Sequence, residues 1–234
     1  MEEALARRLF QRIYSWRFKR ANTPDEPRAI AVIEESVAAG RPVPLLGYWG
    51  CGDRGAANAK DAQALARLGE MDAAARAVFA PGLCITFILT DVHAAVNGKD
   101  PATMRQYFAA ITREAGRCGH ATRFLGALWA DCGFAIADID RRLAATGGAF
   151  SGLPQHQLLV RSARKHARGV DPELAARRYW AACTIDAEVI GRAFPGHILF
   201  TYNGREYAGL LPPLPTMYLY SLRKKTSVKP WFCD

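Results

Sequence analysis

The residues best suited to chemistry follow two short apolar segments of the chain. Segment 43–49 leads into a glycine-rich loop that contains Cys51, and segment 83–90 leads into Asp91 and His93. A thiol, a carboxylate and an imidazole can supply a nucleophile, an anchor for an ammonium group and a general base. We expect Asp91 and His93, two residues apart on an extended segment, to point the same way and act on one ligand. The alternative is a structural Asp cap beside a surface His.

The glycine-rich loop at 50–55 is a candidate anion cradle. Glycine lets the backbone approach a ligand closely, and the helix predicted after the loop would present N–H groups to a phosphate or carboxylate. The loop matches neither GxGxxG nor the P-loop pattern, so a dinucleotide cofactor is not indicated, and a plain tight turn needs similar residues. The candidate substrate-binding residues are Gly50, Gly52, Asp53, Arg54, Asn58, Lys60 and Asn97.

A parallel sheet would bring these two groups of residues together. The two apolar segments are separated by one amphipathic helix over 59–79, which is the pattern of a right-handed βαβ unit. Reactive groups in such sheets lie beyond the carboxyl ends of the strands. With further strands predicted over 123–128, 197–202 and 216–221, the sequence predicts an α/β fold. We expect a single Rossmann-like domain whose mostly parallel central sheet has about five strands and is flanked by helices.

The rest of the chain is predicted to be mainly helical, with helices over 4–20, 30–40, 101–116, 134–145 and 172–194. The glycine- and proline-containing stretch 147–154 reads as an irregular linker. It marks no domain boundary, because the residues after it contain strands that need the same sheet. We divide the single domain 1–234 into N-terminal helices (2–40), a βαβ core (42–98), a basic helical region (155–194) and C-terminal strands with a tail (197–234).

Positive charge is in excess and clustered. The 234 residues include 31 Lys and Arg against 22 Asp and Glu, a net charge of +9. Such a surplus attracts polyanions, although it can also serve solubility alone. The candidate polyanion-binding residues lie in the basic helical region and the tail: Arg161, Arg164, Lys165, Arg168, Arg177, Arg178, Lys224 and Lys225.

Several classes of protein are disfavoured. The six cysteines never form a CxxC pair, which argues against a zinc site and a disulfide scaffold, so we expect no metal and no cofactor. No apolar run approaches the length of a membrane span, and the N-terminal residues do not read as a secretory signal. We therefore expect a cytoplasmic protein without a membrane partner.

The order of these features resembles, over nearly the whole chain, the isocyanide synthase family of dityrosine and pyoverdine biosynthesis. The matching positions are residues 40–44 before the first strand, Arg54 and Asn58 after it, residues 79–82, Asp91, Tyr107 and residues 230–231. Those enzymes have a lysine in the first loop, where this chain has Arg54. The resemblance implies condensation of a free amino acid with a sugar phosphate.

The chain is also similar to cyclodipeptide synthases in size, charge and layout. The run Asp91-Val92-His93, followed by Gly98 and a helix, looks like their second strand and its exit. This resemblance implies that Cys51 stands where the family has its nucleophilic serine, that Tyr179 and Glu188 answer its helix tyrosine and glutamate, and that the basic residues bind tRNA. The catalytic candidates are then Cys51, Asp91, His93, Tyr179 and Glu188.

Charge favours the second resemblance over the first. Two tRNA-bound substrates need an extended positive surface, whereas a free amino acid and a sugar phosphate need one phosphate pocket. The sequence therefore favours aminoacyl-tRNA-dependent peptide-bond formation, with aminoacyl-tRNA and an amino-acid substrate as partners. The alternatives are isocyanide synthase-like condensation and a non-catalytic RNA-binding protein. The last explains the charge but leaves the polar strand ends unused, and the sequence has no RRM, KH or zinc-knuckle signature.

Overall fold

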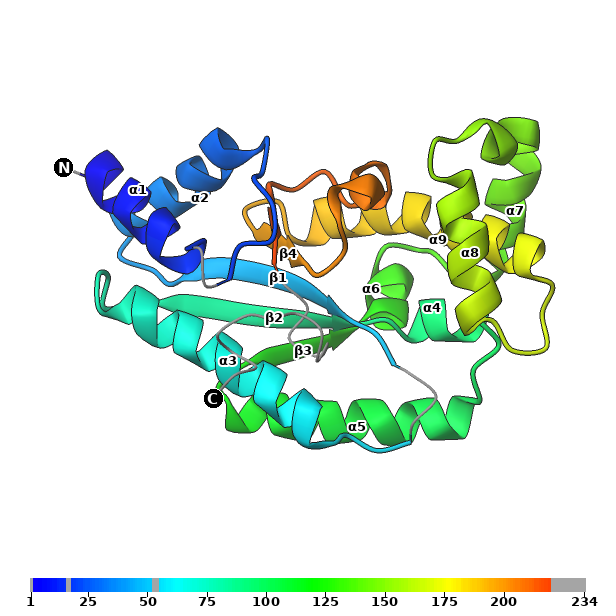
Figure 1. Ribbon diagram of the computed structural model, residues 1–234, viewed down its shortest axis with the longest axis horizontal. Coiled ribbons are helices and arrows are strands. Elements are labelled where there is room, and N and C mark those ends of the chain that lie inside the picture. The colour runs from blue at the N-terminus through cyan, green and yellow to red at the C-terminus, as the bar shows by residue number, and fades with distance from the viewer. Residues whose placement is uncertain (1, 16–17, 52–54, 220–234) are drawn as a thin grey trace.

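The central sheet of the computed structural model, which describes residues 2–15, 18–51 and 55–219, has five strands. Their order is β3-β2-β1-β4-β5, and every neighbouring pair is parallel (Figure 1). The strands are β1 (Val43–Trp49), β2 (Leu83–Leu89), β3 (Ala121–Phe124), β4 (Ile198–Thr201) and β5 (Thr216–Tyr218). The predicted Rossmann-like α/β fold is confirmed.

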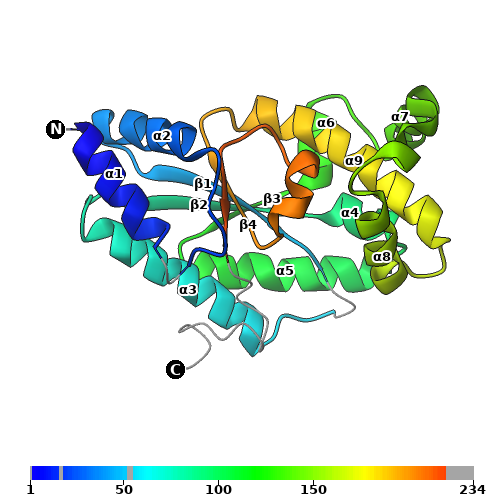
Figure 2. The ribbon, with the colours of Figure 1, turned by 45° about the horizontal axis from the view of Figure 1, so that its top comes forward.

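Helices cover both faces of the sheet and extend beyond one end of it (Figure 2). They are α1 (Glu2–Ile13), α2 (Glu26–Ala38), α3 (Ala59–Arg76), α4 (Asp91–Val96), α5 (Pro101–Arg117), α6 (Leu125–Asp131), α7 (Ala137–Thr146), α8 (His156–His166) and α9 (Pro172–Ala193), with 3-10 turns η1 (Gly147–Gly152) and η2 (Arg205–Leu210). None of the helices in the described ranges combines the length and apolar character that crossing a bilayer requires.

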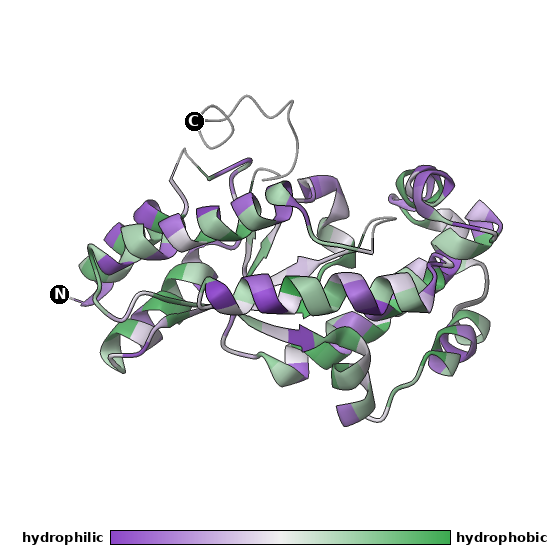
Figure 3. Cartoon of the chain, turned by 90° about the horizontal axis from the view of Figure 1, so that it is seen from below, coloured by the Kyte–Doolittle hydropathy of each residue, from purple (hydrophilic) through white to green (hydrophobic). Residues whose placement is uncertain are grey.

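Two hydrophobic cores lie on opposite faces of the sheet, because successive side chains of a strand point to opposite sides. In β1, Leu45 and Trp49 belong to the core formed with α1, α3 and α5, whereas Leu46 belongs to the core formed with α4, α6 and α9. Figure 3 looks onto α3 and α5, which carry both hydrophilic and hydrophobic residues. Burial on both faces explains why β1 and β2 are continuous apolar runs.

The strand order reverses between β1 and β4. Strands β2 and β3 follow β1 on one side of it, and β4 and β5 lie on the other side. Loops that leave the carboxyl ends of β1 and β4 therefore diverge, and ligand crevices of open α/β sheets form at such a point. The carboxyl ends of β1 and β4 are therefore where we expect the functional site.

Among the predicted elements, two differ most from the structure in their bounds. Helix α1 ends at Ile13, short of the predicted 4–20. The strand predicted over 123–128 is wrong in its second half, because β3 ends at Phe124 and α6 starts at once. Leu125, Leu128 and Trp129 recur at helical spacing and all face the core shared with α9.

The extended segment predicted at Asp91 and His93 is also wrong. Helix α4 begins at Asp91, so two residues correspond to roughly 200° of rotation and the two side chains diverge. An Asp91 carboxylate oxygen instead accepts a hydrogen bond from the backbone N–H of Gly126, at 2.9 Å. The Asp91 carboxylate therefore fixes the start of α6 against α4.

Gly47 in β1 makes room for the ring of Phe200 in β4. A Cβ atom at position 47 would lie 2.2 Å from Cζ of Phe200, a ring that is itself buried against Phe87. We expect Gly47→Ala to lower the free energy of unfolding by about 1–3 kcal/mol, the usual cost of overpacking a core. Urea denaturation followed by circular dichroism measures this. Gly69→Ala in α3 is the control, because no atom lies within 4 Å of its Cβ position; equal losses in the two variants would contradict the packing argument.

Candidate active site

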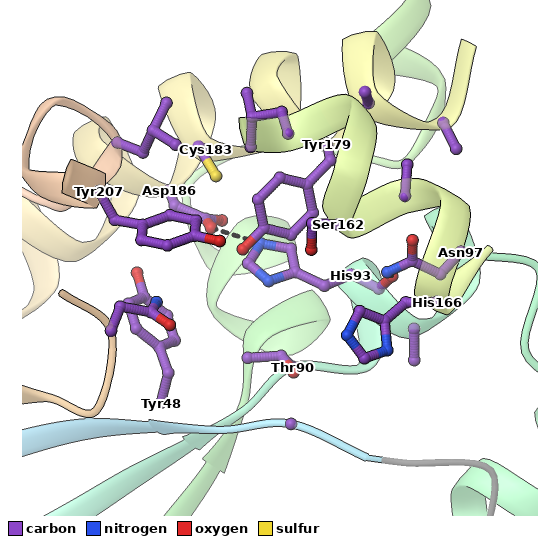
Figure 4. A pocket seen from close by; sticks show the side chains of 18 of the residues that line it. Tyr48, Thr90, His93, Asn97, Ser162, His166, Tyr179, Cys183, Asp186 and Tyr207 are labelled. Atoms are coloured by element: carbon purple, nitrogen blue, oxygen red, sulfur yellow. Dashed lines mark hydrogen bonds and ion pairs between the residues drawn. The ribbon is translucent and has the colours of Figure 1, made fainter. Parts of the chain in front are cut away.

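A cavity of about 350 Å³ opens at the carboxyl ends of β1, β2 and β4, where the strand order reverses. Tyr48, Gly50 and Cys51 line it from the end of β1, and α4, α8 and α9 contribute the other walls. Figure 4 shows polar side chains from these elements converging on the cavity. The cavity lies where the sheet topology predicts a site.

A buried histidine–aspartate pair is the central polar feature. His93 Nε2 lies 2.7 Å from Asp186 Oδ2, and the two side chains are only 12% and 2% exposed. The indole N–H of Trp129 donates to Asp186 Oδ1 at 2.8 Å. A carboxylate only accepts hydrogen bonds, so Nε2 carries the proton and Nδ1 is the basic nitrogen of the ring. The pair can therefore orient an imidazole for proton transfer.

Helix α9 presents three side chains to the cavity at helical spacing: Tyr179, Cys183 and Asp186. The Tyr179 ring lies 4.8 Å from the imidazole of His93, centroid to centroid. Burial raises the pKa of Tyr179 and that of Cys183 well above their ordinary values. Both groups therefore stay protonated near neutral pH.

One cluster in the described ranges has donors of the kind that bind metals. His93, Cys183 and Asp186 offer a nitrogen, a sulfur and an oxygen within 4.8 Å of one another, a set that zinc accepts. Two of these donors already bind each other, His93 through Nε2 and Asp186 through Oδ2. In the structure as described, His93 and Asp186 therefore form a hydrogen-bonded pair.

The structure brings five of the predicted site residues together around the cavity: Gly50, Cys51, His93, Asn97 and Tyr179. The Asn97 amide donates to the His93 backbone carbonyl at 2.9 Å, which holds the end of α4 in place.

Other predicted site residues are placed away from the cavity lining. Asp91 binds Gly126, as described above, and Glu188 pairs with Arg142 and Arg192 at 3.1 and 2.6 Å. Asn58 caps α3 in a reciprocal pair with Asp61, and Lys60 is exposed in the same turn. Gly52, Asp53 and Arg54 lie outside the described residues.

The basic region borders the cavity. Arg161, Arg164, Lys165 and Arg168 are exposed on α8 and just after it, and His166 at the end of α8 lines the cavity together with Lys99. Arg168 lines an adjoining hollow of about 330 Å³ that shares Cys51 and Lys99 with the main cavity. Arg177 is half-buried, Arg178 lies 3.3 Å from Asp140, and Lys224 and Lys225 lie outside the described residues.

Sequence reasoning missed Asp186 and the residues that follow β4. Asp186 stands seven residues after Tyr179, two helical turns along the same face, so this spacing was a usable signal. Tyr202 and Asn203 follow β4 directly, and the strand-end rule that selected Cys51 would have selected them as well.

Comparisons with known proteins agree with the fold. No family model matches the chain, and no curated protein matches it. Among solved structures, the PvcA protein from Pseudomonas aeruginosa is similar with a TM-score of 0.66 and 15% identity, over 97% of this chain and 87% of that one. Tyrosyl-tRNA synthetase from Archaeoglobus fulgidus, complexed with L-tyrosine, gives a TM-score of 0.46 and 14% identity, over 92% and 63%.

The likeness to PvcA shows a shared fold, and the second score is too low to carry an argument. At the level of fold, the distant resemblance that the sequence indicated is confirmed.

Proposed function

We propose that this chain is a biosynthetic enzyme that acts on amino acids and forms peptide bonds from aminoacyl-tRNA, in the manner of cyclodipeptide synthases. One observation carries the proposal: a single cavity combines Cys51 with the buried His93–Asp186 pair, and the basic end of α8 lies at its border. These are the groups that acyl transfer from a polyanionic carrier needs.

The first half-reaction transfers an aminoacyl group to Cys51. The sulfur attacks the ester carbonyl, a C–S bond forms, and the C–O bond to the tRNA ribose breaks. His93 takes the thiol proton and returns it to the leaving ribose oxygen. The product is an aminoacyl thioester, which retains the activation of the ester.

The second half-reaction forms the amide bonds. The amine of a second aminoacyl-tRNA attacks the thioester, so a C–N bond forms and Cys51 leaves as a thiol. The amine of the first residue then attacks the remaining ester and releases the second tRNA. Asp186 is the carboxylate that lines the cavity in the described part of the chain, and it takes the ammonium-binding role expected of Asp91 or Glu188. His93 removes the amine proton.

The surface around the cavity supports a nucleic-acid carrier. Arg161, Arg164 and Lys165 are exposed on α8, while His166 and Lys99 reach the cavity itself. A backbone of phosphates can follow this run of positive charge to the cavity, where the acyl group would enter.

A second candidate is the isocyanide synthase-like condensation of a free amino acid with a sugar phosphate. The observation that favours it is the fold shared with PvcA over nearly the whole chain. In this case Lys99 and His166 would hold the single phosphate.

The test is a reaction of the purified chain with charged tRNAs, analysed by mass spectrometry. We expect a product with the mass of two amino-acid residues, each lacking water, that disappears after ribonuclease treatment; Asp186→Asn is the inactive control. Ribonuclease-insensitive activity that requires a free amino acid and a pentulose phosphate would establish the second candidate instead. Salt-dependent tRNA binding without turnover would indicate an RNA-binding protein.

A further inference from the structure

The hydroxyl of Tyr48 is buried at the cavity and has no hydrogen-bond partner among the described residues. Natural proteins seldom leave such a group unpaired, because it loses its bonds to water and gains nothing in return. Tyr107, which is fully buried, shows the usual arrangement. Its hydroxyl accepts from the Trp49 indole N–H and donates to Asp61 Oδ1, both at 3.1 Å.

The position of Tyr48 relates it to the catalytic pair. It is the last residue but one of β1, and its ring lies 6.2 Å from the imidazole of His93, centroid to centroid. Figure 4 shows Tyr48 rising from the strand side of the cavity, opposite Tyr179 and Cys183 on α9. A ligand between these walls would meet His93 and Tyr48 together.

The Tyr48 hydroxyl has a proton to donate, and an anionic or carbonyl oxygen can accept it. Burial, reinforced by the charge of Asp186, raises the pKa of Tyr48 well above its ordinary value, so the phenol keeps its proton. The same Asp186 charge repels a free carboxylate in this part of the cavity. A neutral carbonyl oxygen is therefore the better acceptor.

We propose that Tyr48 donates a hydrogen bond to the acyl oxygen of an amino-acid ester, so that the cavity selects esterified amino acids over free ones. This inference rests on the proposed function, because it takes an aminoacyl group as the ligand. The α-amine and the acyl oxygen of such a group are only three bonds apart. An amine held at His93 and Asp186 therefore brings the acyl oxygen to the neighbouring wall, where Tyr48 stands.

The experiment compares two ligand sets on two proteins. The probes are the methyl esters of the proteinogenic amino acids and the matching amines that lack the ester group, titrated calorimetrically into wild type and Tyr48→Phe. We expect wild type to bind its best ester about tenfold more tightly than the matching amine, the value of one hydrogen bond. Tyr48→Phe should lose this preference while its affinity for the amine stays within about twofold.

Thermal unfolding supplies the structural control. Tyr48→Phe should keep or raise the Tm, by up to about 2 °C, because it removes a buried group that lacks a partner. Tyr107→Phe should lower the Tm by at least about 2 °C, because it breaks two bonds. An equally large loss in Tyr48→Phe would show that its hydroxyl is bonded within the protein and would overturn the inference.

The outcomes separate this inference from the proposed function. If wild type binds esters and amines equally, or Tyr48→Phe weakens both equally, the role of Tyr48 is wrong while an amino-acid site remains. If wild type binds none of the esters or amines, the proposed function itself fails, and the role of Tyr48 fails with it.

Discussion

Asp186→Asn should lower kcat/KM for peptide-bond formation by about a thousandfold, the range expected when a general base loses the group that orients it. The carboxylate accepts from His93 Nε2 and from the indole of Trp129 at once. An amide in its place has one acceptor oxygen, so one contact is lost or the imidazole changes its tautomer. His93→Gln should cost a similar factor. The double variant should be little worse than either, because residues that act as a unit are not additive.

The control for this prediction is Glu188→Gln on the same helix. Glu188 pairs with Arg142 and Arg192 and does not line the cavity, so kcat/KM should stay within about threefold of wild type, as for a partly exposed ion pair away from the site. Steady-state kinetics with charged tRNAs measures all four variants, and circular dichroism verifies that each is folded. A large loss in Glu188→Gln with an active Asp186→Asn would reverse the assignment.

The parts of the fold that the sequence predicted are those in which local pattern and tertiary burial agree. Strands β1 and β2 are continuous apolar runs because both faces of the sheet are covered, and the rule that ligands lie beyond strand ends then selected Gly50, Cys51 and His93. The strand prediction for segment 123–128 was wrong in its second half, because Leu125 and Leu128 fit a strand and a helix equally well over so short a length. Core contacts with α9 decide for the helix.

The carboxylate that pairs with His93 could not be predicted from the residues next to His93 in the sequence. Asp91 is two residues away in the chain but diverges from it once α4 forms, whereas Asp186 is 93 residues away and in contact. That contact depends on how α9 crosses the sheet, which no local spacing specifies. The sequence did, however, give a reason to prefer Asp186 over Glu188. Asp186 adjoins the buried stripe of α9 that contains Ile185 and Val189.

The choice of nucleophile rests on the difference between two cysteines of the cavity. Burial raises the pKa of Cys183 well above its ordinary value, and the charge of Asp186 adds to this, so Cys183 remains a thiol. The reactive form is the thiolate. Cys51 is half-buried at the carboxyl end of β1 and lines two cavities, so its sulfur is more accessible to an acyl donor than that of the buried Cys183.

Cys51→Ala should therefore lower the rate of peptide-bond formation by about a thousandfold or more, because the acyl-enzyme cannot form. Intact-protein mass spectrometry after mixing with one charged tRNA should show wild type gaining the mass of one aminoacyl group, and Cys51→Ala gaining none. Cys132→Ala is the matched control, since Cys132 is also half-buried but packs in the core beside α6, and it should keep both the adduct and the rate.

Full activity in Cys51→Ala would remove the covalent step. The amine of one aminoacyl-tRNA would then attack the ester of the other directly, with His93 and Asp186 still required as the base, so the two sets of variants together distinguish the covalent from the direct mechanism.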